Sequence, residues 1–305
     1  MFNKNIYSIN RVALIMMLIM TLFFTSFLID DSYAARVSYA KHDRAFRVAD
    51  KSVKGRNCTN FSAIAITGKT LYGLKVHTND NAGVIYKVTN FSKSKKRKMK
   101  AMPIKQGGKV ISVGHANGME YYKGTLFLAT LNAPGQGAQI IATSTSGRVK
   151  KNYYLDKTIS SITYFRNGNF ILGAGLKKID GKQCRRYYVA KYVGGKFEIG
   201  KTFYVNTCLS GQDIHYRKGK LYIVAFDSKT GGRVKTSYIY RINIKSPVKD
   251  EGIYHIRRTI ISRSISKRTS LFELEGIDFY GSRIYCSTNV TRKGNGADAV
   301  YWIKP

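Results

Sequence analysis

The sequence has few acidic residues, few prolines and a single tryptophan. Its 305 residues contain 17 Asp and Glu against 52 Lys and Arg, which gives a formal net charge of +35, and they contain four prolines. A chain with such an excess of positive charge attracts polyanions and speeds its encounter with them. The shortage of carboxylates also restricts any catalytic acid pair to a small set of residues.

Long apolar runs are missing except for one near the N-terminus. Lys4 and Arg11 precede the apolar run 12–28, and the small residues Ser32 and Ala34 follow it. This order is typical of a signal peptide over residues 1–34, cleaved after Ala34, with cleavage after Ala35 as the alternative. An uncleaved membrane anchor is the competing interpretation, because the run is nearly long enough to span a bilayer. We therefore expect a secreted protein.

Helical periodicity is also scarce, whereas strand-forming residues are abundant. The chain has 22 tyrosines and 28 glycines, and almost no segment shows an uninterrupted apolar period of 3.6. Five copies of one pattern recur instead: a small or polar pair, an apolar residue, a glycine turn, and a second strand that opens on an aliphatic residue and then an aromatic or apolar one. The copies begin near residues 60, 115, 158, 210 and 273, and their turn glycines are at 68, 124, 168, 219 and 281.

This spacing predicts an all-β fold, a five-bladed β-propeller, over residues 35–305. Each interval is long enough for four short antiparallel strands and their loops. Only 24 residues follow Gly281, which is enough for three strands, so we expect residues 36–53 to supply the fourth strand and close the ring. A six-bladed ring that uses this N-terminal segment as a degenerate blade is the alternative.

Polar residues stand where the innermost strand of each predicted blade begins. Aligning the copies predicts a ligand-binding mouth at one end of the central channel. Its candidate residues are Ser62, His115, Asn117, Ser160, Gln212, Asp213, Glu273 and Glu275. Polar residues are also tolerated at strand starts that are merely wet, so the pattern alone leaves both interpretations open.

Catalytic motifs are absent. The chain contains no Gly-x-Ser-x-Gly elbow, no His-Glu-x-x-His, no Walker loop and no Cys-x-x-Cys. A hydrolase would need inward carboxylates from several blades, and the set available is Glu120, Asp213, Glu275 and Asp278. Strict alternation along a strand would turn Glu275 and Asp278 to opposite faces. We therefore lean toward a protein that is not an enzyme. We expect no cofactor and no protein-bound metal, with a calcium requirement left open.

Positive charge is concentrated in two places. The predicted polyanion-binding residues are Lys95, Lys96, Arg97 and Lys98 in the first cluster, and Arg257 and Arg258 in the second. Such clusters bind phosphate chains with little discrimination. An exported protein meets anionic cell-wall polymers, membrane surfaces and acidic polysaccharides, so we expect these partners rather than nucleic acid, and a monomer. Solvated cations that only keep the protein soluble are the alternative.

The four cysteines form an even set in a chain that is expected to be exported. Cys184 and Cys208 flank the predicted hairpin at Gly194-Gly195, and Cys58 and Cys286 lie in the first and last blades, which are neighbours in a closed ring. We predict these two pairs as disulfides, although four cysteines allow three connectivities.

Several of these segments resemble the helveticin-J-like secreted bacteriocins, a family of predicted propellers. The resemblance rests on Gly114-His115-Ala116-Asn117 before Leu126-Phe127, on Ser210-Gly211-Gln212-Asp213 before Leu221-Tyr222, and on Glu273-Leu274-Glu275-Gly276 before Ile284-Tyr285. It implies action at the envelope of other bacteria, and it carries no catalytic group to this chain. The sequence thus favours a basic propeller that binds an anionic envelope polymer or glycan. A glycosidase or phosphate-ester hydrolase, and a lectin-like module without turnover, are the alternatives.

Overall fold

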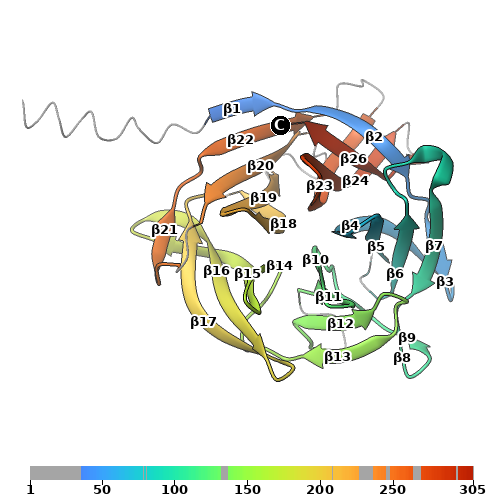
Figure 1. Cartoon of the computed structure of the whole chain (residues 1–305), viewed down its shortest axis with the longest axis horizontal. Helices are drawn as coiled ribbons and strands as arrows, with labels where there is room; N and C mark the ends of the chain where they lie inside the picture. Colours follow the sequence, from blue (N-terminus) through green and yellow to red (C-terminus); the bar gives the residue numbers. More distant parts are fainter. Residues whose placement is uncertain are drawn as a thin grey trace, which may run out of the picture. The chain divides into compact units, whose positions relative to one another are not determined.

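Five β-sheets surround a central axis in the computed structural model, with strands β4, β10, β14, β18 and β23 innermost (Figure 1). The structure describes residues 36–77, 79, 81–131, 137–207, 209–226, 236–244, 248–263, 269–292 and 295–304. The protein is a five-bladed β-propeller, and the N-terminal segment does not form a sixth blade. The predicted signal peptide and Cys208 lie outside the described residues.

The blades are numbered here in chain order. Blade 1 holds β3 (Lys51–Val53), β4 (Arg56–Thr67), β5 (Thr70–His77), β6 (Gly83–Thr89) and β7 (Lys98–Pro103). Blade 2 holds β10 (Gly118–Tyr122), β11 (Thr125–Ala129), β12 (Ile140–Ser144) and β13 (Val149–Tyr153). The 3-10 turn η2 (Ser94–Lys96) precedes β7, and the small hairpin of β8 (Lys105–Gln106) and β9 (Lys109–Val110) lies between the two blades in sequence.

Blade 3 holds β14 (Ser161–Arg166), β15 (Asn169–Ile179), β16 (Lys182–Val193), β17 (Lys196–Val205) and β21 (Gly252–Tyr254). Strand β21 comes from a later part of the chain and pairs with β17 in parallel. Blade 4 holds β18 (Ser210–Arg217), β19 (Lys220–Phe226), β20 (Thr236–Asn243), β22 (Arg258–Arg263) and β1 (Arg36–Tyr39).

The first strands of the chain join its last blade. Blade 5 holds β23 (Thr269–Tyr280), β24 (Arg283–Arg292), β26 (Ala299–Lys304) and β2 (Lys41–Arg47), with β25 (Asn295–Gly296) paired to β24. Strand β2 pairs with β26 in antiparallel fashion from Lys41 opposite Lys304 to Arg47 opposite Ala299. Because β1 belongs to blade 4 and β3 to blade 1, residues 36–53 tie three blades together.

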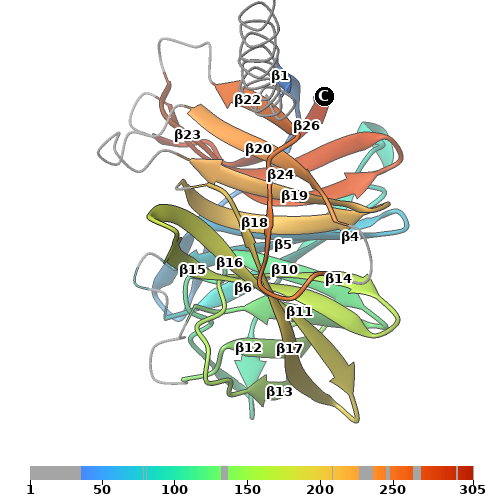
Figure 2. The same cartoon turned by 90° about the vertical axis from the view of Figure 1, so that its left-hand side faces the viewer.

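An apolar cluster fills each of the five interfaces between neighbouring blades. Between blades 2 and 3, for example, Phe127 and Ile140 pack against Ile162, Phe170 and other side chains. Figure 2 shows the sheets stacked with their faces toward one another. A single blade leaves its apolar faces exposed, and burial of each such side chain stabilises the fold by roughly 1.5 to 3 kcal/mol, so the closed ring is the stable arrangement.

An ion cluster around a buried lysine lies where the ring closes, with Asp298 buried and Asp50 39% exposed. Lys75 on β5 is fully buried, and its Nζ lies 2.5 Å from Asp50 Oδ1 and 2.9 Å from Asp298 Oδ2. The same Nζ donates to the carbonyl oxygen of Val48 at 3.2 Å. Val48 and Asp50 follow β2, and Asp298 precedes β26, so one lysine of blade 1 holds both chain segments of the closure.

The predicted disulfide between Cys58 and Cys286 is not formed, because both are buried free thiols, as is Cys184. Cys58 belongs to the apolar cluster between blades 5 and 1, whereas Cys286 belongs to the cluster between blades 4 and 5. The two thiols therefore lie on opposite sides of the blade 5 sheet. Burial raises the pKa of Cys58 to about 11, which keeps the thiol protonated and unreactive at neutral pH.

No helix within the described residues is long and apolar enough to cross a membrane.

Candidate functional site

Two of the inner strands, β18 and β23, carry a β-bulge toward the end of the ring axis at which the inner strands begin. In β18 the paired residues are Gly211 with Ala225 and Ile214 with Ile223, so two residues, Gln212 and Asp213, oppose a single residue on β19. In β23 the same shift places Glu275 and Gly276 opposite Ser287. Such a bulge redirects side chains out of the regular alternation. We call this end of the axis the mouth.

A chain of hydrogen bonds between side chains crosses the mouth from blade to blade. Asn117 of blade 2 donates its Nδ2 to Gln212 Oε1 of blade 4 at 2.5 Å. Gln212 in turn donates its Nε2 to Glu273 Oε1 of blade 5 at 3.0 Å. Asn117 and Gln212 are buried and Glu273 is half-buried. Three of the predicted mouth residues thus form one connected network.

The network continues through two residues that the sequence analysis missed. Asn289 on β24 donates its Nδ2 to Glu275 Oε1 at 2.7 Å and to Asn60 Oδ1 at 2.6 Å, and its Oδ1 accepts from the backbone nitrogen of Phe61 at 2.7 Å. Asn289 lies opposite Glu273 in the sheet, on a second strand and not an innermost one. The pairing of β23 with β24, which sets Asn289 opposite Glu273, is the signal that could have identified this residue.

Glu273 and Glu275 are in contact, and together they retain a proton. Burial raises the pKa of Glu275 well above its usual range, and the charge and hydrogen bond of the Glu273 carboxyl raise it further. Burial also raises the pKa of Glu273, against the hydrogen bonds from Gln212 and Glu275 and the nearby positive charge of His115. The Glu273 carboxyl therefore opposes the ionisation of Glu275, and burial opposes the ionisation of both.

Other predicted mouth residues are not part of this network. Ser62 and Ser160 are buried, and their hydroxyls donate to the carbonyl oxygens of Leu74 and Gly173 in their own blades. Asp213 follows Gln212 on β18 and is buried. Its carboxylate accepts from the backbone nitrogens of Ile214 and Ile277.

The inner strands of neighbouring blades are in close contact at Gly118 and Gly276. A Cβ added to Gly118 would lie 2.6 Å from the Cα of Ser161, and one added to Gly276 would lie 2.5 Å from the backbone nitrogen of Ile64. Glycine is required at both positions because neighbouring backbones fill the space of a side chain.

Three titratable residues form a layer beyond the glycines, which we call the lower layer: Glu120, His215 and Asp278. Glu120 accepts from Thr163 Oγ1 at 3.0 Å and from the backbone nitrogen of Tyr164 at 2.8 Å, both in the next blade. Asp278 accepts from the backbone nitrogen of Ile66 at 2.5 Å, again in the next blade.

These hydrogen bonds join neighbouring blades at their innermost strands. An innermost strand has no further strand to pair with, so its exposed backbone N–H groups need acceptors. In three of the five interfaces that acceptor is a carboxylate from the preceding blade: Glu120 for blade 3, Asp213 for blade 5 and Asp278 for blade 1. In the interface between blades 3 and 4 the Thr163 hydroxyl accepts from the Tyr216 nitrogen. The inward carboxylates therefore connect the blades.

Burial raises the pKa of Glu120 and of Asp278 to about 7 in each case. The Nδ1 of His215 lies 3.4 Å from Asp278 Oδ1, and burial lowers the pKa of this histidine. The lower layer thus holds two carboxyls with pKa values near neutral pH beside a histidine whose pKa is lowered.

The carboxylates do not have the spacing of a glycosidase pair at the mouth. Retaining enzymes hold their two carboxyls about 5 to 5.5 Å apart and inverting enzymes about 6.5 to 9.5 Å apart. Glu273 and Glu275 share a hydrogen bond instead. Within the described part of the chain, no group of three or more His, Cys, Asp or Glu residues is arranged to hold a metal ion.

The predicted polyanion-binding residues lie outside the ring. Lys95, Lys96 and Lys98 are exposed at η2 and the start of β7. Arg97 differs, because its Nε donates to the carbonyl oxygen of Phe91 at 3.0 Å and its guanidinium lies 4.4 Å from the ring centre of Phe46. It packs on the protein and leaves the three lysines as the accessible charges of this cluster.

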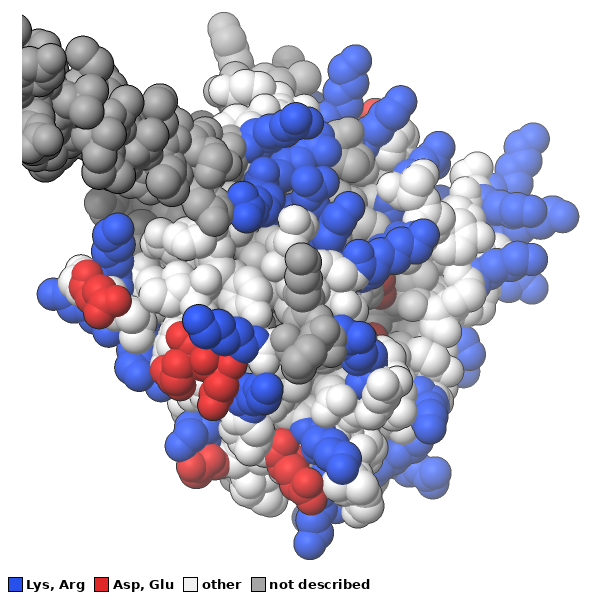
Figure 3. All heavy atoms as spheres, turned by 60° about the vertical axis from the view of Figure 1, so that its left-hand side comes forward, with Lys and Arg blue, Asp and Glu red and all other residues white. Residues whose placement is uncertain are grey.

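The second basic cluster lies on the outer strands of blade 4. Arg257 is exposed beside β22, and Arg258 is half-exposed, with its Nη2 3.3 Å from Ser38 Oγ of β1. Figure 3 shows that Lys and Arg spread over most of the visible face, with Asp and Glu confined to small patches.

Comparison with known proteins indicates the fold alone. No family model matches the chain, and no curated protein matches it. Among solved structures, GH43B of the Bacteroides ovatus xyloglucan PUL superposes with a TM-score of 0.50 at 14% identity, over 85% of this chain and 54% of that one. This chain therefore spans about half the length of that protein. The α-L-arabinofuranosidase PaAbf62A from Podospora anserina superposes with a TM-score of 0.51 at 8% identity, over 88% of this chain and 98% of that one. At these identities the chain is similar to the two proteins in its propeller architecture, and the resemblance to helveticin-J-like proteins stays a prediction.

Proposed function

We propose that the protein is a secreted propeller that binds an anionic polymer of the cell envelope through the cations of its outer surface. The observation that supports this most strongly is the separation of charge between the inside and the outside of the ring. Six carboxyl groups are buried or half-buried: Glu120, Asp213, Glu273, Glu275, Asp278 and Asp298. Among the described Lys and Arg side chains, two are buried, Lys75 and Arg185, and nine are half-buried, so most of the cations are exposed.

The separation makes the surface more basic than the composition alone implies. The sequence contains 17 acidic residues, and those inside the ring do not neutralise the cations outside it. Burial also raises the pKa of several inward carboxyls, which removes negative charge near neutral pH. A field of one sign over most of a surface concentrates polyanions there and has little preference for their sequence or linkage.

Co-sedimentation of the secreted chain with bacterial cell walls tests the proposal. Walls that carry their anionic polymers should bind the protein, and walls stripped of those polymers should bind at least tenfold less. Lys95→Glu/Lys96→Glu should weaken binding more than Lys95→Gln/Lys96→Gln, because it reverses the charge that the glutamines only remove. Equal binding to intact and stripped walls would refute the proposal.

Glycan hydrolysis is the second candidate function, and the protonated carboxyl at the mouth favours it. A general acid must hold its proton at the working pH, and the raised pKa of Glu275 meets this condition. Release of soluble sugars from cell-wall polysaccharide, and its loss in Glu275→Gln, would support it. Binding without any released product would leave the first proposal as the whole function.

A further inference from the structure

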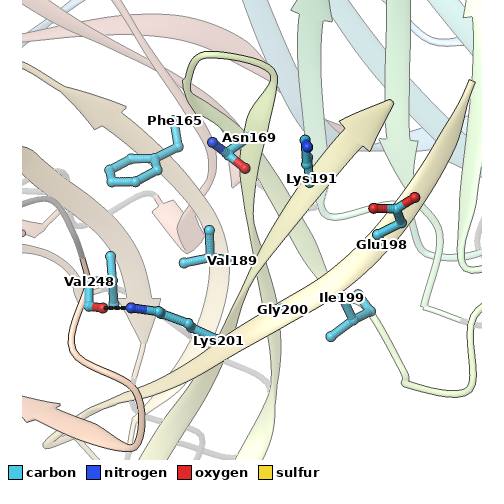
Figure 4. Close-up of a pocket in the computed structure, with 9 residues that line it drawn as sticks. All are labelled: Phe165, Asn169, Val189, Lys191, Glu198, Ile199, Gly200, Lys201 and Val248. Carbon is cyan, nitrogen blue, oxygen red and sulfur yellow. Dashed lines mark hydrogen bonds between the residues drawn. The ribbon is translucent and has the colours of Figure 1, made fainter. Parts of the chain in front are cut away.

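A pocket of about 400 Å³ extends across strands β14 to β17 of blade 3. Its position is far from the mouth network, at the interface with blade 4, and its volume suits a small ligand. Figure 4 shows the lining residues: Phe165, Asn169, Val189, Lys191, Glu198, Ile199, Gly200, Lys201 and Val248.

A bulge between β16 and β17 lies at this pocket. Tyr188 pairs with Thr202 and Ala190 with Ile199, so Gly200 and Lys201 together oppose Val189. A Cβ on Gly200 would lie 3.1 Å from the carbonyl oxygen of Val189, so a side chain there would press on the neighbouring strand. The pocket is therefore built into the sheet by the register shift.

One side of the pocket is apolar. Phe165 and Val248 belong to the cluster between blades 3 and 4, and Val189 packs against that cluster. Figure 4 shows Phe165 and Val248 at one end of the pocket with Val189 near its middle, while Asn169 lies beside Phe165 and Lys201 reaches Val248. Such a surface suits the C–H face of a sugar or polyol.

The other side presents cations that are incompletely paired. Lys201 donates one hydrogen bond, from Nζ to the carbonyl oxygen of Val248 at 3.2 Å, and an ammonium group has three donors. The side chain of Lys191 makes no hydrogen bond or ion pair within the described part of the chain, even though the residue lies opposite Glu198 in the sheet. Arg166, which is not a lining residue, holds its guanidinium 4.9 Å from the ring centre of the lining residue Phe165.

The charges and the shape together select a class of ligand. Two cations, Lys191 and Lys201, line the pocket with one carboxylate, Glu198, which favours an anion, while Glu198 and Asn169 offer acceptors for hydroxyl groups. We infer that this pocket, which we call the blade 3 pocket, binds one phosphate-bearing sugar or polyol unit of the envelope polymer. The inference rests on the proposed function and gives it a defined contact in addition to the diffuse surface charge.

Calorimetric titration of the secreted chain with a short poly(glycerol phosphate) oligomer, near physiological salt, tests the inference. Lys191→Gln/Lys201→Gln should weaken binding at least tenfold. The matched control is Lys51→Gln/Lys69→Gln, which removes the same charge from exposed positions of blade 1 and should weaken binding no more than about twofold. Asn169→Trp fills the pocket without a change of charge and should also weaken binding at least tenfold.

The outcomes separate the two proposals. Equal losses in the two glutamine variants would overturn the blade 3 pocket and leave binding by surface charge intact. Oligomer binding by folded Asn169→Trp at the level of the unmodified chain would overturn it as well. Absence of oligomer binding by an unmodified chain that still binds intact walls would overturn the blade 3 pocket, whereas equal binding to intact and stripped walls would overturn the proposed function. If Asn169→Trp does not fold, as judged by circular dichroism, the two glutamine variants decide the matter.

Discussion

Replacing Lys75 by methionine should destabilise the closed ring strongly, and more at pH 8 than at pH 5. Methionine fills a similar volume, but it removes the ammonium that contacts Asp50, Asp298 and the carbonyl oxygen of Val48. Breaking a buried ion pair by removing one partner costs about 3 to 5 kcal/mol, because the remaining charge is left uncompensated. For a domain of this size that corresponds to a fall of roughly 10 °C in the melting temperature.

The pH dependence follows from Asp298. Burial raises the pKa of this carboxyl, and the charge of Lys75 opposes the rise. Without the lysine the pKa of Asp298 rises further, so the carboxyl takes up a proton more readily at pH 5 and the buried charge disappears. At pH 8 the charge persists and the full cost remains.

Equilibrium unfolding in guanidinium chloride provides the measurement. The single tryptophan, Trp302, lies on β26 beside the closure and reports on it by fluorescence. Lys69→Met is the matched control, since Lys69 is exposed, and it should change the free energy of unfolding by less than about 0.5 kcal/mol. A loss below about 1 kcal/mol for Lys75→Met, equal at both pH values, would refute the reasoning.

Three further predictions concern the inside of the ring. The folded-state pKa values of about 7 for Glu120 and Asp278 lie above their unfolded values, so both groups stabilise the fold at low pH. That stability is lost as pH rises through about 7, by roughly 3 kcal/mol for Glu120 and roughly 4 kcal/mol for Asp278; unfolding curves that coincide at pH 5 and pH 8 would contradict this. Gly276→Ala should lower the free energy of unfolding by about 1 to 3 kcal/mol through overpacking, whereas Gly175→Ala, where a Cβ meets nothing within 4 Å, should not. The three buried cysteines of the described chain should react with a thiol reagent only after denaturation, and their modification in the native protein would show that the interfaces open.

The propeller was predictable because its signals are local and repeat. Each blade has a glycine turn between its innermost strand and the next one, and Gly68, Gly124 and the equivalent glycines all adopt positive φ angles. The intervals between them predict strands and loops without any knowledge of distant contacts. The separation of charge could be predicted only in part. Composition indicates the excess of cations, but it does not indicate where the carboxyls lie.

The details of the site depend on register, which the sequence does not display. Bulges at Gln212 and Glu275 interrupt the alternation on which the prediction for the inner strands relied. Asn289 joins the mouth from a neighbouring strand because it lies opposite Glu273. The same limit explains the error at Cys58 and Cys286, whose blades are neighbours but whose side chains face different interfaces.

The salt dependence of binding to a purified anionic wall polymer tests the central claim most directly. Each phosphate contact on a flexible polyanion contributes a slope of about 0.7 to the logarithmic plot of affinity against salt, so four contacts should weaken binding about 50-fold between 50 and 200 mM salt. We predict a linear plot with at least that slope. An affinity that stays constant across the series would contradict the account, because the surface cations would then contribute nothing to binding.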